Sequence, residues 1–257
     1  MKVVVLPRRT LCWGGLIAAG VVLAAILAGT LAKRAVPAAA SVRKIPIYSV
    51  ETAEKKISIS FDAAWGNEDT AQLIAELEKY HVKATFFVVG QWVDKYPESV
   101  KALSDAGHEV MNHSDTHPHM PQLSAAQMRA EIASCNRKIA AVTGRTPTLL
   151  RPPYGDYNNT LVETLRDMGM HCIQWDVDSL DWKGLSAAEI TQRVVSRVRN
   201  GSIVLFHNAA KHTPEALPGI LDTLITQQGY TIVPISALIY PDVFEGDHEG
   251  RQHAASQ

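Results

Sequence analysis

Two histidines lie four residues apart in the segment Asn112–His117, and this spacing can place two imidazoles on one ion. If the segment forms one helical turn, His113 and His117 point the same way, as two ligands of a divalent metal must. Such a pair alone is weak support for a metal site, but its position directly after an expected strand strengthens it. His119 is a weaker candidate. The pair therefore predicts a metal site.

An aspartate and an arginine also stand at the ends of expected strands. Asp62 closes the strictly alternating run 57–62, and Arg151 stands directly before Pro152 and Pro153. Two successive prolines fix φ near −65° and force an extended exit from the strand, which can hold the guanidinium toward a carboxylate. The next residue, Tyr154, offers a backbone N–H to an anion. A stiff surface loop is the alternative interpretation of this run.

A second acid–base group follows two further runs. Asp178 and Asp181 stand beside Trp182 after one run, and His207 ends a nearly continuous apolar run. A histidine near a carboxylate can act as a general acid, because the carboxylate tunes its pKa. A tryptophan beside carboxylates can stack on a sugar or close a pocket. A capped loop with a core tryptophan is the alternative.

Strand-like and helix-like stretches alternate through the body of the chain. The expected strands are 57–62, 84–89, 109–111, 149–151, 170–177, 202–206 and 231–233. The expected helices are 68–80, 97–106, 124–142, 158–168, 186–199 and 214–228. This α/β alternation predicts a parallel sheet, either a closed or nearly closed barrel or a doubly wound open sheet. Both place active groups at the carboxyl ends of the strands.

The N-terminal region predicts a membrane segment. Residues 11–32 carry no charge, and a helix of that length would span roughly 33 Å, enough for a hydrocarbon core. We expect an uncleaved signal anchor within residues 1–34 and a tether over residues 35–52. The competitor is a cleaved signal peptide, because the small residues Ala38–Ala40 resemble a cleavage site. The body is expected outside the cytoplasm of a single-pass membrane protein.

Charge argues against nucleic acid as a partner. Residues 1–50 contain seven of the 25 lysines and arginines and none of the 26 acidic residues, which leaves −8 on residues 51–257. A body this acidic repels a phosphate backbone. The three cysteines are too few for a disulfide scaffold. Cys135 and Cys172 are expected to be buried free thiols, and the alternative is a pair between them if the fold brings them together.

In combination, these motifs resemble the polysaccharide deacetylase family, the NodB-homology domains, over about residues 53–241. The segments that carry the resemblance are Ser60–Asp62, His113–His117, Arg151–Gly155, Asp178–Trp182 and Leu205–His207. The resemblance implies a distorted (β/α)7 barrel. It also implies hydrolysis of acetyl groups on chitin, peptidoglycan or a related glycan with a divalent metal, expected to be Zn²⁺.

The resemblance also implies roles for single residues. His113 and His117 correspond to metal ligands, and Asp62 to the base that activates water, held by Arg151. The Tyr154 N–H would stabilise the oxyanion. Leu205 and Trp182 would line the pocket for the acetyl methyl group. His207 corresponds to the general acid, tuned by Asp181, and Asp178 to a structural member of the same network.

One position departs from the family pattern. The first motif of the family contains a second aspartate, which completes the metal triad, and here Ala63 stands in its place. A methyl group cannot coordinate a cation, and two neutral imidazoles alone bind zinc weakly. We expect one of three outcomes: waters fill the position, Asp62 or Asp115 substitutes, or the site is metal-poor and slow.

The small residue followed by Trp65-Gly66 resembles the sporulation-associated, PdaB-like branch of the family. This resemblance implies a spore or cell-envelope setting with peptidoglycan as the glycan. The competing hypotheses are a weak or inactive homologue that binds glycan structurally, and a soluble, metal-free sugar-processing barrel. The polar tail 242–257 is expected to be disordered, with solvated histidines.

Overall fold

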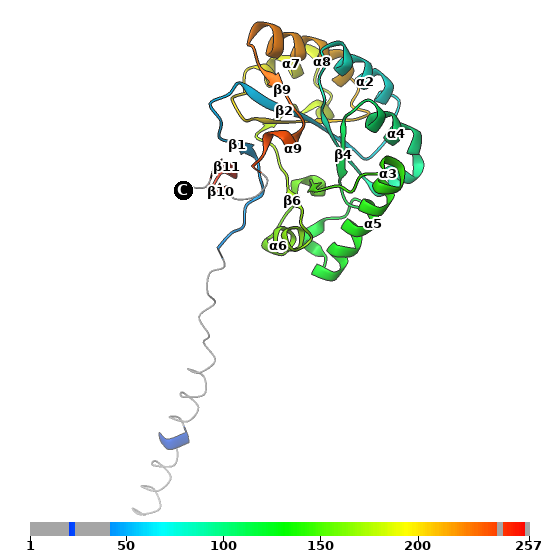
Figure 1. The fold of residues 1–257 in the computed structure, drawn as a ribbon. Helices are drawn as coiled ribbons and strands as arrows, with labels where there is room; N and C mark the ends of the chain where they lie inside the picture. The colour runs from blue at the N-terminus through cyan, green and yellow to red at the C-terminus, as the bar shows by residue number, and fades with distance from the viewer. Residues whose placement is uncertain (1–20, 24–41, 241–243, 255–257) are drawn as a thin grey trace, which may run out of the picture. The chain divides into compact units, whose positions relative to one another are not determined.

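The computed structural model describes residues 21–23, 42–240 and 244–254 (Figure 1). The chain divides into two compact units, Met1–Arg43 and Lys44–Gln257. The first unit contains the predicted membrane anchor and the candidate cleavage site, which lie outside the described residues except for three helical residues at 21–23. Within the described part of the chain, no helix has the length and apolar character needed to cross a bilayer.

The second unit is built on a curled, parallel half-barrel sheet with helices packed around it (Figure 1). The strand order is β6-β5-β4-β3-β2-β8-β7, and β9 pairs with the start of β2. The strands are β2 (Lys56–Ala63), β3 (Thr85–Val88), β4 (Glu109–Asn112), β5 (Leu149–Leu150), β6 (His171–Cys172), β7 (Val177–Asp178), β8 (Ile203–His207) and β9 (Thr231–Ile232). The prediction of a parallel α/β architecture is confirmed.

Alternation in β2 separates a packing face from a polar face. Phe61 belongs to the main apolar cluster and stacks on Phe86 with ring centroids 4.8 Å apart. Ser60 and Asp62 lie on the opposite face, and both contact Arg151. Successive side chains of a strand point to opposite faces, so the alternating sequence itself sends Asp62 toward the interior of the half-barrel.

The helices lie outside the sheet, and three of them begin at side-chain capping residues. Ser124 and Ser186 form capping boxes with Gln127 and Glu189, and Asn158 caps a third helix. The helices are α2 (Thr70–Lys79), α3 (Gly90–Lys95), α4 (Pro97–Asp105), α5 (Ala125–Thr143), α6 (Asn159–Asp167), α7 (Ala187–Val195), α8 (Thr213–Leu221) and α9 (Ile235–Leu238). A π-helical turn, η4 (Asp222–Gln227), continues α8. Sequence analysis missed α3 and α9.

The single strand predicted over 170–177 is wrong, because the structure contains two strands there. β6 pairs with β5 at one edge of the sheet, whereas β7 pairs with β8 at the other edge. The intervening residues carry the chain across the half-barrel, and Gln174 hydrogen-bonds to the Gly155 carbonyl on the way (2.8 Å). The strand-like pattern could not reveal this crossing, since both strands and the link between them are buried or half-buried.

The predicted tether and disordered tail are wrong where residues 49–50, 244–246 and 251–254 form the strands of a small sheet. β1 (Ser49–Val50) pairs in parallel with β11 (Arg251–Ala254), and β10 (Phe244–Gly246) pairs antiparallel with β11 (Figure 1). Gly250 has φ +77°, and a Cβ there would lie 2.6 Å from the Pro46 carbonyl oxygen, so glycine is required. Backbone pairing needs no apolar pattern, and polar composition therefore concealed these strands.

The histidine of β11 is also not solvated as predicted. His253 Nδ1 lies 2.6 Å from Glu51 Oε2, and its Nε2 lies 3.2 Å from Asp247 Oδ2.

The two described cysteines match the prediction. Cys135 and Cys172 are buried and unpaired, and burial raises the pKa of the Cys135 thiol to about 12. Neither is a reactive thiol at neutral pH.

Candidate active site

Chemically active side chains gather at the carboxyl edge of the sheet, as the strand pattern predicts. Asp62 and His207 are register partners on the adjacent strands β2 and β8, and His113 and Arg151 directly follow β4 and β5. Asp62, His113 and His207 line a cavity of about 460 Å³, and Arg151 is buried behind Asp62. The lining residues of the cavity are Asp62, Ala64, Trp65, His113, His117, Tyr154, Gly155, Trp175, Asp178, Trp182, Leu205, His207 and Asn208.

A fully buried ion pair fixes the carboxylate at the floor of this cavity. Arg151 Nη1 donates to Asp62 Oδ1 at 2.8 Å, and Nη2 donates to Ser60 Oγ at 2.8 Å. The guanidinium also lies 4.3 Å from the centre of the Phe87 ring. Burial acts to raise the pKa of Asp62, but the neighbouring positive charge, that of Arg151 above all, outweighs burial and holds the pKa below its ordinary value. Asp62 is therefore an ionised carboxylate able to accept a proton.

The two prolines position Arg151 as the sequence predicts. Pro152 continues in an extended conformation, with φ −71° and ψ 140°, and a short 3₁₀ turn, η2 (Pro153–Gly155), follows. Tyr154 in that turn has φ +62°, a left-handed conformation that is uncommon for a bulky residue. Strain of this kind is found where a loop must present a residue in one place, and here the exposed Tyr154 lines the cavity.

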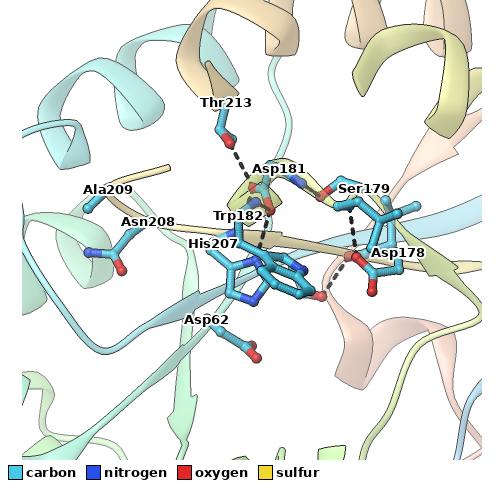
Figure 2. Close-up of polar contacts among 12 residues, drawn as sticks. Asp62, Asp178, Ser179, Asp181, Trp182, His207, Asn208, Ala209 and Thr213 are labelled. Carbon is cyan, nitrogen blue, oxygen red and sulfur yellow. Dashed lines mark hydrogen bonds and ion pairs between the residues drawn. The ribbon is translucent and has the colours of Figure 1, made fainter. Parts of the chain in front are cut away.

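A second carboxylate holds His207 (Figure 2). Asp181 Oδ1 lies 2.8 Å from His207 Nδ1 and also accepts the Trp182 N–H. Its Oδ2 accepts the His207 N–H at 2.8 Å and the Thr213 hydroxyl at 2.7 Å. Because a carboxylate only accepts, Nδ1 is the donor, and this leaves Nε2 as the nitrogen that can exchange a proton.

The environment of His207 favours its protonated form. Burial acts to lower its pKa, but the hydrogen bond and charge of Asp181, together with the charges of Asp62 and Asp178, outweigh burial and raise the pKa above 6.5. Asp62, with a lowered pKa, thus stands on the strand next to a histidine with a raised pKa. Two titratable groups whose pKa values are moved apart in this way are suited to act as base and acid.

The two histidines of the first motif also lie together. The ring centroids of His113 and His117 are 5.1 Å apart. Burial lowers the pKa of His113, and burial lowers that of His117 to about 4, so both imidazoles are neutral near pH 7, as metal ligands must be. His113 Nδ1 donates to the Arg151 carbonyl at 2.7 Å, which leaves Nε2 unprotonated and 3.6 Å from Asp62 Oδ2.

The segment between these histidines is not the helical turn that sequence analysis considered. Asn112 Oδ1 accepts the Ser114 N–H, and Ser114 Oγ accepts the His117 N–H. Glu131 of α5 accepts the N–H groups of residues 115 and 116. Side-chain hydrogen bonds therefore shape an irregular loop, in which Ser114 and His117 have positive φ. This loop, and not helical spacing, brings the two imidazoles together.

The donor set fits a metal ion only in part. A catalytic zinc site uses three protein ligands, and among the described residues no group of three histidine, cysteine or acidic side chains is arranged to hold a metal. Ala63 is buried in the main apolar cluster. Asp62 stands close to His113 but is bound to Arg151. His117 Nδ1 is a buried nitrogen without a hydrogen-bond partner in the described structure.

Asp115 is not the substitute ligand that sequence analysis considered. Its Oδ1 forms an ion pair with Lys138 at 2.7 Å, and its Oδ2 accepts the Ser134 hydroxyl at 2.9 Å. These partners both belong to α5, so the carboxylate is engaged away from the imidazole pair. His119 is also engaged elsewhere, since its Nδ1 lies 2.6 Å from Asp156 Oδ2 and its ring stacks on Tyr154.

The remaining predicted residues line the cavity or support it. Leu205 and Trp182 both line it, and Trp182 is exposed. Asp178 lines it too, and its Oδ1 accepts the Leu180 N–H (2.9 Å), which fits the predicted structural role.

Sequence analysis missed two positioning groups and two aromatic lining residues. Thr213 donates to Asp181, and Asn208 binds the loop after β2. Trp65 and Trp175 line the cavity. The position of Asn208 directly after His207 was the one available signal.

Comparisons with known proteins agree with this geometry. A family model for polysaccharide deacetylase matches residues 49–173. The solved structure of the peptidoglycan deacetylase PdaC from Bacillus subtilis is 35% identical, with 74% of this chain and 92% of that chain covered and a TM-score of 0.66. The chain belongs to the polysaccharide deacetylase family.

Members of the family differ in activity. BA3943 from Bacillus anthracis, described as a CE4 family pseudoenzyme, is 33% identical over 83% of this deacetylase-family chain and 73% of its own, with a TM-score of 0.72. The peptidoglycan-N-acetylglucosamine deacetylase PgdA from Listeria monocytogenes is 34% identical, and the match covers 82% of this chain and 44% of PgdA. The chain thus spans less than half the length of that curated relative.

Proposed function

We propose that the protein removes N-acetyl groups from the amino sugars of a cell-wall glycan, with peptidoglycan as the substrate. The observation that supports this most directly is the pairing at one cavity of Asp62, held by Arg151 and with a lowered pKa, with His207, held by Asp181 and with a raised pKa. A protein that only binds sugar has no need of an acid and a base with opposed pKa values.

In this proposal each pair performs one proton transfer. Asp62 accepts the proton of a water that attacks the acetyl carbonyl, and Arg151 keeps that carboxylate ionised and aimed. His207 Nε2 gives its proton to the departing amine, while Asp181 stabilises the imidazolium. The Tyr154 N–H binds the carbonyl oxygen as it gains charge, and Leu205 with Trp182 encloses the methyl group.

A divalent cation, with Zn²⁺ as the expected ion, belongs to the proposal. His113 and His117 would hold it, and a bound cation would polarise the carbonyl and acidify water. Metal binding by these two residues is supported by their neutral imidazoles and by His117 Nδ1, which has no hydrogen-bond partner among the described residues. The missing third ligand predicts weak binding, and the reaction steps above therefore rest on the chain's own residues.

A second function, a glycan-binding homologue with weak or no activity, is favoured by one observation. Ala63 occupies the position of the family's third metal ligand, and the chain is similar to BA3943, a described pseudoenzyme. In this case the protein would act structurally in envelope or spore assembly. The intact acid–base pairs favour the first function.

The proposed setting is the outer face of a cell membrane. The uncharged run 11–32 supports a single-pass anchor that holds the catalytic unit near the glycan. The Ala63-to-Gly66 sequence, similar to the sporulation-associated branch, supports a role during spore formation. Cell fractionation and the timing of expression test these two points.

Acetate release tests the proposed function. The full-length chain, stripped of metal, is incubated with N-acetylglucosamine oligomers or purified peptidoglycan and given Zn²⁺, Co²⁺ or Mn²⁺ in turn. We expect metal-dependent acetate release that is absent in a folded His207→Ala control. No release with any metal, from protein with a native circular dichroism spectrum, would favour the glycan-binding function.

A further inference from the structure

Exposed aromatic rings are concentrated at the cavity. In the described part of the unit Lys44–Gln257, three large apolar side chains are exposed: Trp65 at 66%, Tyr154 at 57% and Trp182 at 58%. All three line the same cavity. Exposed apolar area costs free energy unless a ligand covers it, and its confinement to one site points to a ligand with apolar faces.

Two of these rings belong to a continuous aromatic row on the histidine side. The Trp65 ring lies 5.0 Å from the His117 ring, which lies 4.6 Å from the Tyr154 ring. Tyr154 in turn stacks on His119, with centroids 4.1 Å apart and an interplanar angle of 15°. The third exposed ring, Trp182, follows Asp181 in the acid–base group instead. No ring contact joins Trp182 to this row among the described residues.

The backbone around Trp65 is firmly held. Asn208 Nδ2 donates to the carbonyls of Trp65 and Gly66, each at 2.7 Å, and its Oδ1 accepts the Ala64 N–H. The Trp92 indole donates to the Gly66 carbonyl at 2.6 Å. Gly66 has φ +60°, and a Cβ there would lie 2.8 Å from Ala209 Cβ. A backbone held in advance reduces the entropy that is lost when a ligand binds to the ring it carries.

We propose that Trp65 is a sugar-stacking platform which, with the Tyr154–His119 stack, extends the glycan site along the histidine side of the cavity. A ring that only covered His117 would itself be buried, whereas Trp65 is two-thirds exposed. The flat apolar faces of pyranose rings match such a platform. The ligand is then an oligosaccharide long enough to contact Trp182 and Trp65 together, and single sugars bind poorly. The inference rests on the proposed glycan substrate.

Calorimetric titration of the full-length protein in EDTA tests the platform without turnover. The ligands are N-acetylglucosamine and its linear oligomers up to the hexamer. We expect affinity to rise with length, and Trp65→Ala to weaken hexamer binding about tenfold, a change of about 1.4 kcal/mol. Binding of the single sugar stays unchanged, and Trp65→Phe retains part of the hexamer affinity. Tyr230→Ala, which removes an aromatic ring at the opposite end of β2, is the matched control.

Acetate release by the same wild-type protein separates this inference from the proposed function. Loss of hexamer affinity in Trp65→Ala without any acetate release by the wild type would support the platform and refute catalysis. Acetate release with equal hexamer affinity in wild type and Trp65→Ala would refute the platform and support catalysis. Failure of the hexamer to bind more tightly than the single sugar would also overturn the platform.

Discussion

The two sides of the cavity differ in how many hydrogen bonds their polar groups make. On the acid–base side, Asp181 accepts from four donors and Arg151 donates to three acceptors, while the Arg151 Nε is buried without a partner among the described residues. On the histidine side, His117 Nδ1 is buried without a partner in the described structure, and Ala63 replaces a ligand. This difference shows that the proton-transfer groups are preorganised, whereas the metal position lacks a third protein ligand.

The largest expected effect comes from breaking the acid–base side at Arg151. Arg151→Met leaves the Asp62 carboxylate buried without its counter-charge, and we expect a loss of about 3–5 kcal/mol in the free energy of unfolding. Chemical denaturation measures it. The matched control is Arg129→Met, which removes an exposed pair with Asp167 and costs about 0–1 kcal/mol. Equal costs for the two variants would mean that the acid–base side is not held as described.

His207→Ala is expected to affect catalysis instead of stability. Removing the proton donor lowers the rate of acetate release by about 10²–10⁴-fold, the usual contribution of general acid catalysis. Zinc affinity stays the same, because His207 is not among the proposed ligands. Retained turnover would show that His207 is not the acid. A loss of zinc affinity in the same variant would show that His207 also contributes to the metal position, so that the two sides of the cavity are not independent.

Asp181→Asn tests the acid–base side through the pH dependence of the rate. Against the lowering effect of burial, Asp181 raises the pKa of His207, so the variant lowers that pKa and moves the alkaline limb of the rate profile to lower pH. In the wild type this pair stabilises the fold below pH 6.5, and the contribution is lost as pH rises through the raised pKa of the folded state. NMR titration of the imidazole measures the shift. An unmoved His207 pKa in the variant would contradict the assignment.

The smallest effect is expected at Asp115. Because its carboxylate binds Lys138 and Ser134, Asp115→Asn should leave zinc affinity within about twofold, well under the 1.4 kcal/mol of a tenfold change. Calorimetric zinc titration of wild type and variant tests this. A large loss of affinity would show that the carboxylate reaches the imidazole pair, and the two sides would then differ less than the structure indicates.

Sequence could predict what depends on chain direction and local pattern. Parallel strands end at one edge, so the convergence of Asp62, His113, Arg151 and His207 followed from their positions after apolar runs. It could not predict what depends on partners distant in the chain. The engagement of Asp115 by α5, the crossing between β6 and β7, and the pairing of β1 with β11 all arise only in the folded molecule.

Trp65 illustrates the same limit at the level of one residue. Its place beside the position that departs from the family pattern was visible, but its function was not. Exposure, contact with His117 and fixation by Asn208 are properties of the folded cavity. A tryptophan in a sequence is more often part of a core, and only the structure separates the two cases.

Zinc titration of the wild type beside Ala63→Asp tests the difference between the two sides most directly. Calorimetry gives the affinity, and acetate release gives the half-saturating zinc concentration. Ala63→Asn, similar in size but without charge, controls for disturbance of the apolar cluster around residue 63. We predict that Ala63→Asp binds zinc at least about tenfold more tightly, or 1.4 kcal/mol, with a saturating rate close to that of the wild type. Equal zinc affinity in Ala63→Asp and the wild type would contradict the account.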